Sequence, residues 1–266
     1  MPSNTHSTEM IFYSSAQSPL FSDLPITFYV SSRYGGHSPK PYDSLNLAYH
    51  THDSPTSVTS NRTKLCNALF PQSPLLWLNQ THSDHIIEFN DLSSLPLDGL
   101  IGSGDALICA QKHIACMVMV ADCNPILVYN PRQKIFALIH AGRAGVCNAI
   151  LTKTITKLLN TYHSAAKDLL IFIGPSIRKC CYAISPKLAK DFPSYALQAP
   201  PNTIVHTNTQ NPHLDLIALL SLQLSALKIP PEHIQIHPAC SCCSKDLFSY
   251  RRDGLTGRFA LLVMQT

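Results

Sequence analysis

Four apolar runs follow one another at short intervals in the middle of the chain. They cover residues 106–110, 114–121, 126–129 and 135–139. Each run is apolar almost without interruption, whereas a strand with one wet face alternates apolar and polar residues. The pattern therefore predicts strands that are covered on both faces, in the interior of a layered domain.

Helical patterns come before and after these predicted strands in the sequence. A Pro in the first turn favours a helix over residues 55–69, and an apolar stripe predicts another over residues 145–160. Asp215 is a suitable cap for a third helix. Helices and strands do not alternate steadily, so the pattern indicates a layered α+β domain rather than a doubly wound sheet.

The chain reads as one domain. Its 266 residues are 45% hydrophobic and 14% charged, which is enough to bury a large core. No repeat or linker divides it, so we expect a single domain over residues 26–266. Residues 1–25 are rich in Ser and Thr and predict a tail or an edge strand. Residues 249–258 predict a hairpin or tight loop, and the alternative is that its three arginines border a functional site.

Charge and cysteine usage limit the partners and the compartment. The net charge is only +4, without a long basic run, so neither nucleic acid nor a membrane surface is an expected partner. No apolar stretch reaches the roughly 20 residues that span a bilayer. A chain with its own core does not need disulfides, so we expect its ten cysteines to be reduced and the protein to be cytoplasmic.

Three predicted strands each lead into a side chain that can bind a metal. The strand at residues 75–79 precedes His82, the strand at 114–120 precedes Cys123, and the strand at 135–139 precedes His140. Two imidazoles and one thiolate leave a fourth tetrahedral position open, as in catalytic zinc sites. Such a site lowers the pKa of a bound water to about 7. The spacing alone leaves open that these residues are simply packed at strand ends.

Short motifs follow one another along almost the whole chain. They are Arg33-Tyr34-Gly35-Gly36, Tyr42-Asp43-Ser44-Leu45-Asn46-Leu47, Asn61-Arg62, Gln80-Thr81-His82, Gly104-Asp105-Ala106, Ala121-Asp122-Cys123-Asn124-Pro125, His140-Ala141-Gly142, Gly174-Pro175-Ser176, Leu214-Asp215-Leu216 and Tyr250-Arg251-Arg252-Asp253-Gly254. In this order the motifs resemble those of the YfiH-type family, which is also known as the laccase-domain or polyphenol oxidase-like family. The resemblance runs from about residue 27 to residue 264.

The resemblance implies a fold, a metal and a reaction. The fold would be a single-domain α/β/β/α sandwich with mixed sheets, similar to that of cysteine hydrolases. The metal ligands would be His82, Cys123 and His140, which suit zinc, with copper also possible. The implied activity is that of a purine nucleoside phosphorylase that cleaves adenosine, inosine and methylthioadenosine with phosphate and also deaminates adenosine. The oligomeric state stays open between a monomer and a small homo-oligomer.

Further residues are candidates for catalysis and substrate binding. Asp122, beside the ligand Cys123, would be a general base or would orient a ligand, although a loop cap is an equal alternative. Arg33 and Arg62 would bind phosphate, while Ser44 and Asn46 would contact the ribose or the base. For the two arginines, bracing of a loop is an equal alternative.

One departure from the family pattern bears on substrate preference. The family continues His-Ala-Gly with Trp-Arg-Gly, whereas this chain has Arg143-Ala144-Gly145. The free amides of a helix beginning near Gly145 would hold an anion. A non-catalytic binding protein is also conceivable on the basis of this substituted turn.

Other classes of protein use similar residues. A Cys–His hydrolase would use Cys123 as nucleophile and His140 or His82 as base, on an amide such as a mis-loaded peptidoglycan precursor. A four-copper laccase needs several His-x-His pairs, and only His50-Thr51-His52 has that form. A zinc nucleobase deaminase needs a His-x-Glu motif, which the sequence lacks. Cys240 and Cys243 resemble half of a zinc site, but without a second pair of suitable spacing they favour a packed thiol cluster.

Overall fold

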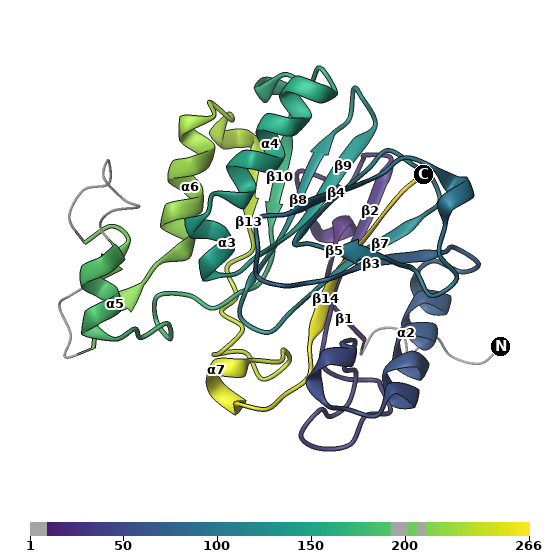
Figure 1. Ribbon diagram of the computed structural model, residues 1–266, viewed down its shortest axis with the longest axis horizontal. Coiled ribbons are helices and arrows are strands. Elements are labelled where there is room, and N and C mark those ends of the chain that lie inside the picture. The colour runs from purple at the N-terminus through teal and green to yellow at the C-terminus, as the bar shows by residue number, and fades with distance from the viewer. Residues whose placement is uncertain (1–9, 193–201, 207–210) are drawn as a thin grey trace.

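Two sheets stack face to face, and helices cover the outer face of each (Figure 1). The computed structural model describes residues 10–192, 202–206 and 211–266. Residues 1–9 of the predicted tail or edge strand lie outside this range. The layers form one α+β domain with mixed sheets, which confirms the predicted fold class.

The first sheet is antiparallel over its first four strands and parallel over the rest. The N-terminal strand lies at its edge. Its order is β1 (Ile11–Ser14), β2 (Ile26–Ser31), β14 (Phe259–Gln265), β7 (Ala115–Val120), β3 (Leu75–Asn79) and β5 (Leu100–Ser103).

The second sheet has four antiparallel strands at its centre and a parallel pair at each edge. It carries three of the four predicted apolar runs. Its order is β13 (Ile234–Ile236), β10 (Leu170–Ile173), β8 (Asn124–Asn130), β9 (Ile135–Ala141), β6 (Ala106–Cys109) and β4 (Ile86–Phe89).

Burial on both faces explains the continuous apolar runs. In β7, Cys116 and Val118 point into the core between the sheets, while Met117 and Met119 pack in the outer layer. All six residues of β7 are buried. A strand in this position has no wet face, which is why its sequence does not alternate.

Helices complete the four layers. The outer face of the first sheet is covered by α2 (Pro55–Leu69), through residues such as Leu65. The outer face of the second sheet is covered by α3 (Arg143–Cys147), α4 (Ile150–Thr161) and α6 (Leu216–Ala226) (Figure 1). Among the residues that the structure describes, no helix is long and apolar enough to cross a membrane. The remaining elements are α5 (Pro186–Asp191), α7 (Tyr250–Asp253), β11 (Val205–His206) and β12 (His213–Leu214), besides short 3₁₀ turns.

Two predicted elements are wrong in detail. The single helix predicted over residues 145–160 is two helices, because Ala149 adopts a left-handed conformation with φ 60°. Both helices bury apolar residues against the same sheet, so the stripe continues across the break and hides it. The segment 249–258 was predicted as a hairpin or a tight loop, and of these the hairpin is wrong. The segment begins with the single turn α7, which the Ser249 side chain caps by accepting from the backbone N of Arg252 at 3.2 Å.

The chain passes from one sheet to the other three times in the same region. Residues 80–85 join β3 to β4, residues 104–105 join β5 to β6, and residues 121–123 join β7 to β8. We call these segments the three crossovers. Backbone that changes layers presents side chains at the sheet ends, which is a rigid place to mount a site.

Candidate metal centre and its cavity

The strand register places Cys123, His140 and Asp105 side by side. β8 and β9 pair so that Pro125 is opposite His140, and Cys123 immediately precedes β8. β6 and β9 pair so that Ala106 is opposite Ile139, and the ladder extends through the backbone bond from His140 N to Asp105 O at 2.7 Å. His140 is the last but one residue of β9. The sequence had suggested that it follows the strand.

His82 reaches the same point from the first crossover. The Gln80 side chain makes both hydrogen bonds of a missing strand residue, donating to Met119 O at 2.7 Å and accepting from Met119 N at 2.8 Å. This fixes the crossover beside the end of β7. His82 then adopts a left-handed conformation, φ 59°, which turns its ring toward Cys123.

The structure brings the three predicted ligands together. The His82 and His140 ring centroids are 4.8 Å apart, and one ligand atom from each of the three residues lies within 4.8 Å of the others. A tetrahedral zinc ion with ordinary bond lengths would separate a thiolate sulfur from an imidazole nitrogen by about 3.6 Å. Cys123 Sγ and His82 Nε2 are 3.8 Å apart, so the residues fit one such ion. Their role as ligands stays a prediction.

Asp105 orients His140, and sequence reasoning did not single it out. Its buried carboxylate lies 2.7 Å from His140 Nδ1, which leaves Nε2 to face the other two ligands. It also accepts from the backbone N of His82 at 3.0 Å and of Ser83 at 2.6 Å. A carboxylate behind a ligating histidine fixes the ring and its tautomer. The available signal was an Asp directly before the strand predicted at residues 106–110.

The charged forms of Asp105, Cys123 and His140 stabilise one another. Burial opposes ionisation of Asp105, yet hydrogen bonds from His140 and Ser83 hold its pKa well below the usual range. Burial also opposes ionisation of Cys123, but the His140 charge and hydrogen bonds from both histidines lower the pKa of this thiol to about 6. Against burial, Cys123 and Asp105 raise the pKa of His140 to about 9. Cys123 is thus a thiolate at neutral pH, the form that binds metals and attacks electrophiles.

Gly142 makes room for the cluster. A Cβ at this position would lie 2.9 Å from Cys123 Sγ and 3.0 Å from His82 Cδ2. Those atoms belong to the rigidly held ligands, so any other residue would displace them. The space that the ligands need therefore accounts for the glycine of the His-Ala-Gly motif.

The cluster opens into a cavity of about 540 Å³, the size of many small-molecule sites. Its wall carries cations, aromatic rings and apolar side chains together. The lining residues are His50, Asn79, Gln80, His82, Met119, Val120, Ala121, Asp122, Cys123, His140, Arg143, Ile177, Tyr182, Leu216, Tyr250, Arg251 and Arg258.

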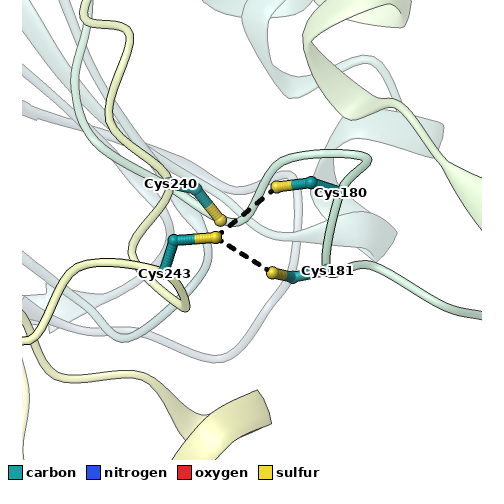
Figure 2. A group of neighbouring side chains, drawn as sticks. All are labelled: Cys180, Cys181, Cys240 and Cys243. Carbon is teal, nitrogen blue, oxygen red and sulfur yellow. Dashed lines mark hydrogen bonds between the residues drawn. The ribbon is translucent and has the colours of Figure 1, made fainter.

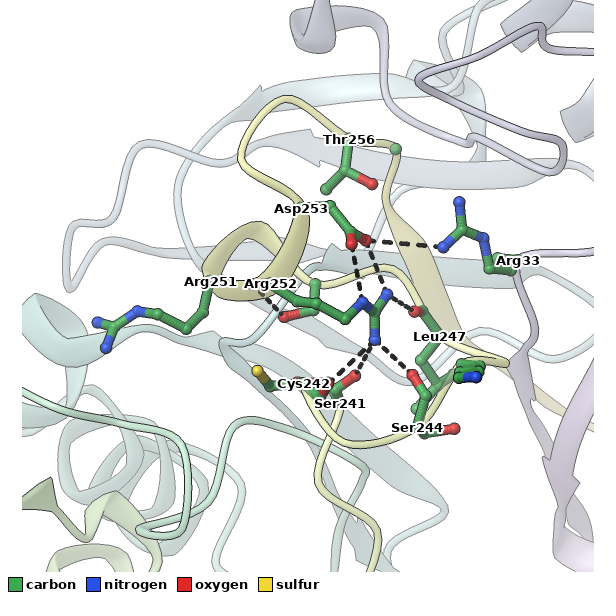
Figure 3. Close-up of polar contacts among 12 residues, drawn as sticks. Arg33, Ser241, Cys242, Ser244, Leu247, Arg251, Arg252, Asp253 and Thr256 are labelled. Atoms are coloured by element: carbon green, nitrogen blue, oxygen red, sulfur yellow. Dashed lines mark hydrogen bonds and ion pairs between the residues drawn. The ribbon is translucent and has the colours of Figure 1, made fainter.

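The arginines that line this cavity, Arg143, Arg251 and Arg258, are not the two that were expected to bind phosphate. Arg258 is partly buried, and its Nη1 donates to the carbonyls of Thr256 at 2.8 Å and Gly257 at 3.0 Å. Arg251 donates from Nη1 to Ala183 O at 2.6 Å. Its neighbour Arg252 points elsewhere and binds backbone carbonyls and Asp253 (Figure 3).

Arg33 and Arg62 lie away from the cavity wall as the structure describes it. Arg33 pairs with Asp43 at 3.5 Å. It also pairs with Asp253 at 3.6 Å, as Figure 3 shows. Arg62 is buried, and its Nε donates to Leu47 O at 2.8 Å. Both guanidinium groups brace loops, so we do not assign phosphate binding to them.

Ser44 and Asn46 are also absent from the described cavity wall. Ser44 Oγ accepts from Gly36 N at 3.0 Å. Asn46 is fully buried, and its Nδ2 donates to Asp53 Oδ2 at 2.9 Å while its Oδ1 accepts from Arg258 N at 2.9 Å. The loop uses these side chains to satisfy its own polar groups, so we do not assign nucleoside binding to them.

Asp122 lines the cavity, but its carboxylate is engaged. Oδ1 accepts from Ser241 Oγ at 2.7 Å, and Oδ2 accepts from Arg251 N at 2.7 Å. It therefore joins the third crossover to the turn that carries Arg251. This arrangement favours a positioning role over the predicted general base.

His50 is a further cavity residue that sequence reasoning weighed only as part of a His-x-His pair. Burial and the charge of Arg258 lower its pKa to about 4. His50 is therefore a neutral hydrogen-bonding group at physiological pH.

The fold and the site together define a class of protein. It is a single-domain α+β sandwich with a His₂Cys donor group at the sheet crossovers and a cationic cavity over that group. The chain belongs to the family described as multi-copper polyphenol oxidoreductase laccase, whose sequence model matches residues 27–266. This confirms the resemblance stated from the motifs.

Relatives and solved structures cover most of the chain. It is 32% identical over 234 residues to a protein named purine nucleoside phosphorylase from Mycobacterium tuberculosis, covering 88% of this chain and 89% of that protein. A protein of the same name from Corynebacterium glutamicum is 32% identical over 241 residues, covering 90% and 94%. The crystal structure of Bacillus licheniformis hypothetical protein YfiH superposes with a TM-score of 0.84 at 25% identity, covering 94% and 98%. For YlmD from Geobacillus stearothermophilus the TM-score is 0.82 at 26% identity, covering 92% and 94%.

Proposed function

We propose that this protein cleaves purine nucleosides with inorganic phosphate at the cavity over His82, Cys123 and His140. The observation that carries the proposal is one cavity that joins a His₂Cys donor group, three arginines and two tyrosines. The names of the relatives support the same reaction. Adenosine, inosine and methylthioadenosine are the proposed substrates, with deamination of adenosine as a side activity.

The donor set suits a zinc ion, with copper as the alternative, because soft thiolate and imidazole ligands bind both. A bound ion would supply Lewis-acid stabilisation of negative charge at the cavity floor. This chain's residues hold the donors in place: Asp105 fixes the His140 tautomer, and Gly142 leaves the space. Four laccase coppers would need many more imidazoles than the one histidine pair of this group.

Arg143 and Arg258 are the proposed phosphate ligands. Phosphate binds arginine as a planar fork, and both side chains line the cavity. Arg143 is exposed, whereas Arg258 is partly buried and therefore attracts an anion more strongly. Arg258 lies close enough to Cys123 for the thiolate charge to act on its pKa. Arg251 is the third cation, but its contacts with Ala183 and Tyr182 hold the wall in place.

Tyr182 and Tyr250 offer flat surfaces to the purine. Aromatic rings stack on one another with offset or tilted geometry, and both tyrosines line the cavity. In the reaction, a phosphate oxygen forms a bond to C1′ while the bond from C1′ to the purine nitrogen breaks. The electron pair leaves on the purine, which then takes up a proton. The arginines offset the negative charge of the incoming phosphate, which would otherwise repel the negative charge that develops on the leaving purine.

One observation favours a second candidate, a Cys–His hydrolase. Cys123, His140 and Asp105 are ordered as nucleophile, base and orienting carboxylate, with 2.7 Å between the last two groups. The thiol pKa of about 6 suits a nucleophile. The substrate would be an amide such as a mis-loaded peptidoglycan precursor.

Product analysis separates the two candidates. Purified protein is incubated with inosine, with adenosine or with an amide substrate, with and without phosphate. We expect free base and ribose 1-phosphate only when phosphate is present, and inosine as a minor product of adenosine. Amide cleavage by metal-free protein, together with stable labelling of Cys123 by substrate, would support the hydrolase and contradict the phosphorylase.

We also propose a cytoplasmic location and a monomer or small homo-oligomer. All ten cysteines are free thiols in the structure, which suits a reducing compartment. Cell fractionation and light scattering test the two statements.

A further inference from the structure

Four cysteines meet outside the cavity. Cys180 and Cys181 follow β10, and Cys240 and Cys243 follow β13 (Figure 2). One sulfur atom from each residue lies within 4.8 Å of the other three. We propose that these thiols form a second metal site, which binds one Zn²⁺ ion as a tetrathiolate.

The sulfur separations fit a single tetrahedral ion. Zinc–sulfur bonds of about 2.3 Å place neighbouring sulfurs about 3.8 Å apart. Cys180 Sγ and Cys243 Sγ are 3.7 Å apart, and Cys181 Sγ and Cys243 Sγ are 3.3 Å apart (Figure 2). A disulfide would need about 2.05 Å between bonded sulfurs. The thiols thus surround a space of the right size for an ion.

The backbone holds both cysteine pairs in place. Cys240 and Cys243 have the C-x-x-C spacing of zinc sites, and they lie in a turn closed by Ser244 N donating to Cys240 O at 3.0 Å. The two segments are joined by Ser241 N donating to Ser176 O at 3.0 Å. The second pair, which spacing did not reveal, comes from a segment about 60 residues earlier.

Groups around the four sulfurs stabilise thiolate charge and leave a path by which an ion can enter. Arg178 N donates to Cys240 Sγ at 3.4 Å, a bond that orients and stabilises a thiolate. The Arg178 guanidinium offsets part of the negative charge of the site. Cys180 and Cys243 are exposed, so an ion can enter from solvent. Binding of Zn²⁺ would release the four thiol protons and requires no oxidant.

The ion would clamp one wall of the cavity. Tyr182 directly follows Cys181 and lines the cavity, as does Ile177. Ser241, inside the C-x-x-C turn, holds the carboxylate of Asp122. A tetrathiolate has no open position, so the proposed role is structural, in contrast to that of the His₂Cys group.

Cobalt substitution tests the proposal in full-length protein. The background is the Cys123→Ala variant, which removes the only sulfur of the His₂Cys group. We expect this variant to bind Co²⁺ with a sulfur-to-cobalt charge-transfer band of four-thiolate intensity, and to retain one zinc per chain. Adding Cys240→Ser and Cys243→Ser should abolish both signals.

A matched variant controls for the loss of two cysteines. It adds Cys242→Ser and Cys66→Ser to the same background, and it should keep the band. Cys242 lies in the same turn and near Cys181, but it is outside the group of four close sulfurs.

Alkylation of folded wild-type protein gives a readout that needs no variant. Zinc should slow the modification of Cys180 and Cys243. A missing cobalt band in the Cys123→Ala variant, a band that survives loss of Cys240 and Cys243, or a disulfide between the two segments would overturn the proposal.

Discussion

Replacing Asp105 by Asn should weaken metal binding without removing a ligand. The carboxylate accepts from His140 Nδ1 at 2.7 Å and from the backbone N of His82 and Ser83 at 3.0 and 2.6 Å. Oδ1 accepts from both His140 Nδ1 and the backbone N of His82, whereas Oδ2 accepts from the backbone N of Ser83. An amide has one acceptor oxygen, so when that oxygen keeps the Ser83 bond, its NH₂ faces His140 Nδ1 and the backbone N of His82. Nδ1 must then accept, so the ring proton moves to Nε2, the atom that should bind the metal.

The structure sets the size of the effect. Loss of such an orienting partner costs about 10- to 100-fold in metal affinity, or about 1.4 to 2.8 kcal/mol. Asp105 is fully buried and meets several donors, and removing one partner from a buried charged pair costs about 3 to 5 kcal/mol. We expect a loss of folding stability in that range, because the donors lose a charged acceptor.

Competition with a chromogenic chelator measures the affinity, and denaturant unfolding measures the stability. Asp84→Asn is the matched control, because Asp84 lies in the same crossover as His82 but pairs with Lys153 at the surface. Its metal affinity should equal that of the wild type. An Asp105→Asn variant that binds metal as tightly as the wild type would refute the reasoning on the tautomer.

Three further predictions concern the arginines and the thiols. Arg62→Lys should lower the free energy of unfolding by about 3 kcal/mol in thermal unfolding. The reason is that lysine loses the stacking of the guanidinium on Tyr49 and Trp77, whose ring centroids are 4.3 and 4.2 Å away. The KM for phosphate should stay unchanged, and a selective rise in this KM would return Arg62 to the substrate site. Arg258→Gln should lower kcat/KM for phosphate about 10- to 100-fold in steady-state assays, and an unaltered value would remove Arg258 from the phosphate site. In metal-free protein, the rate of thiol alkylation, followed by peptide mass spectrometry, should rise with pH around 6 at Cys123 and only around 11 at Cys66, whose pKa is raised by burial. The thiolate fraction of each residue grows as the pH passes its pKa. Equal pH profiles for the two residues would contradict the charge distribution.

Much of the fold could be predicted because its strands are buried on both faces. The continuous apolar runs correspond to β6, β7, β8 and β9, and the Pro at its first position marks the start of α2. The break at Ala149 could not be predicted, since a left-handed alanine leaves no trace in composition.

The metal-capable residues could be found from sequence because each follows or ends a strand. Asp105 was missed, since its importance arises from the pairing of β6 with β9, and register is a tertiary property. Cys180 and Cys181 were missed as partners of Cys240 for the same reason, because they approach it only when β10 and β13 pair.

The substrate residues were the least predictable part. A polar loop side chain can face a ligand or its own backbone, and the sequence pattern is the same in both cases. The side chains of Asn46 and Arg62 bond to backbone carbonyls and an amide around the loop instead of to a ligand. In Arg258 the backbone amide binds Asn46 while the side chain reaches the cavity. Only the folded loop distinguishes these outcomes.

The central claim is that His82, Cys123 and His140 hold one ion that phosphate-dependent cleavage requires. The most direct test is the rate of hypoxanthine release from inosine and phosphate, by metal-stripped protein, as zinc is added back. We predict that zinc restores release in the wild type but not in the Cys123→Ala variant. Full release by metal-stripped wild-type protein, or restoration by zinc in Cys123→Ala, would contradict the account.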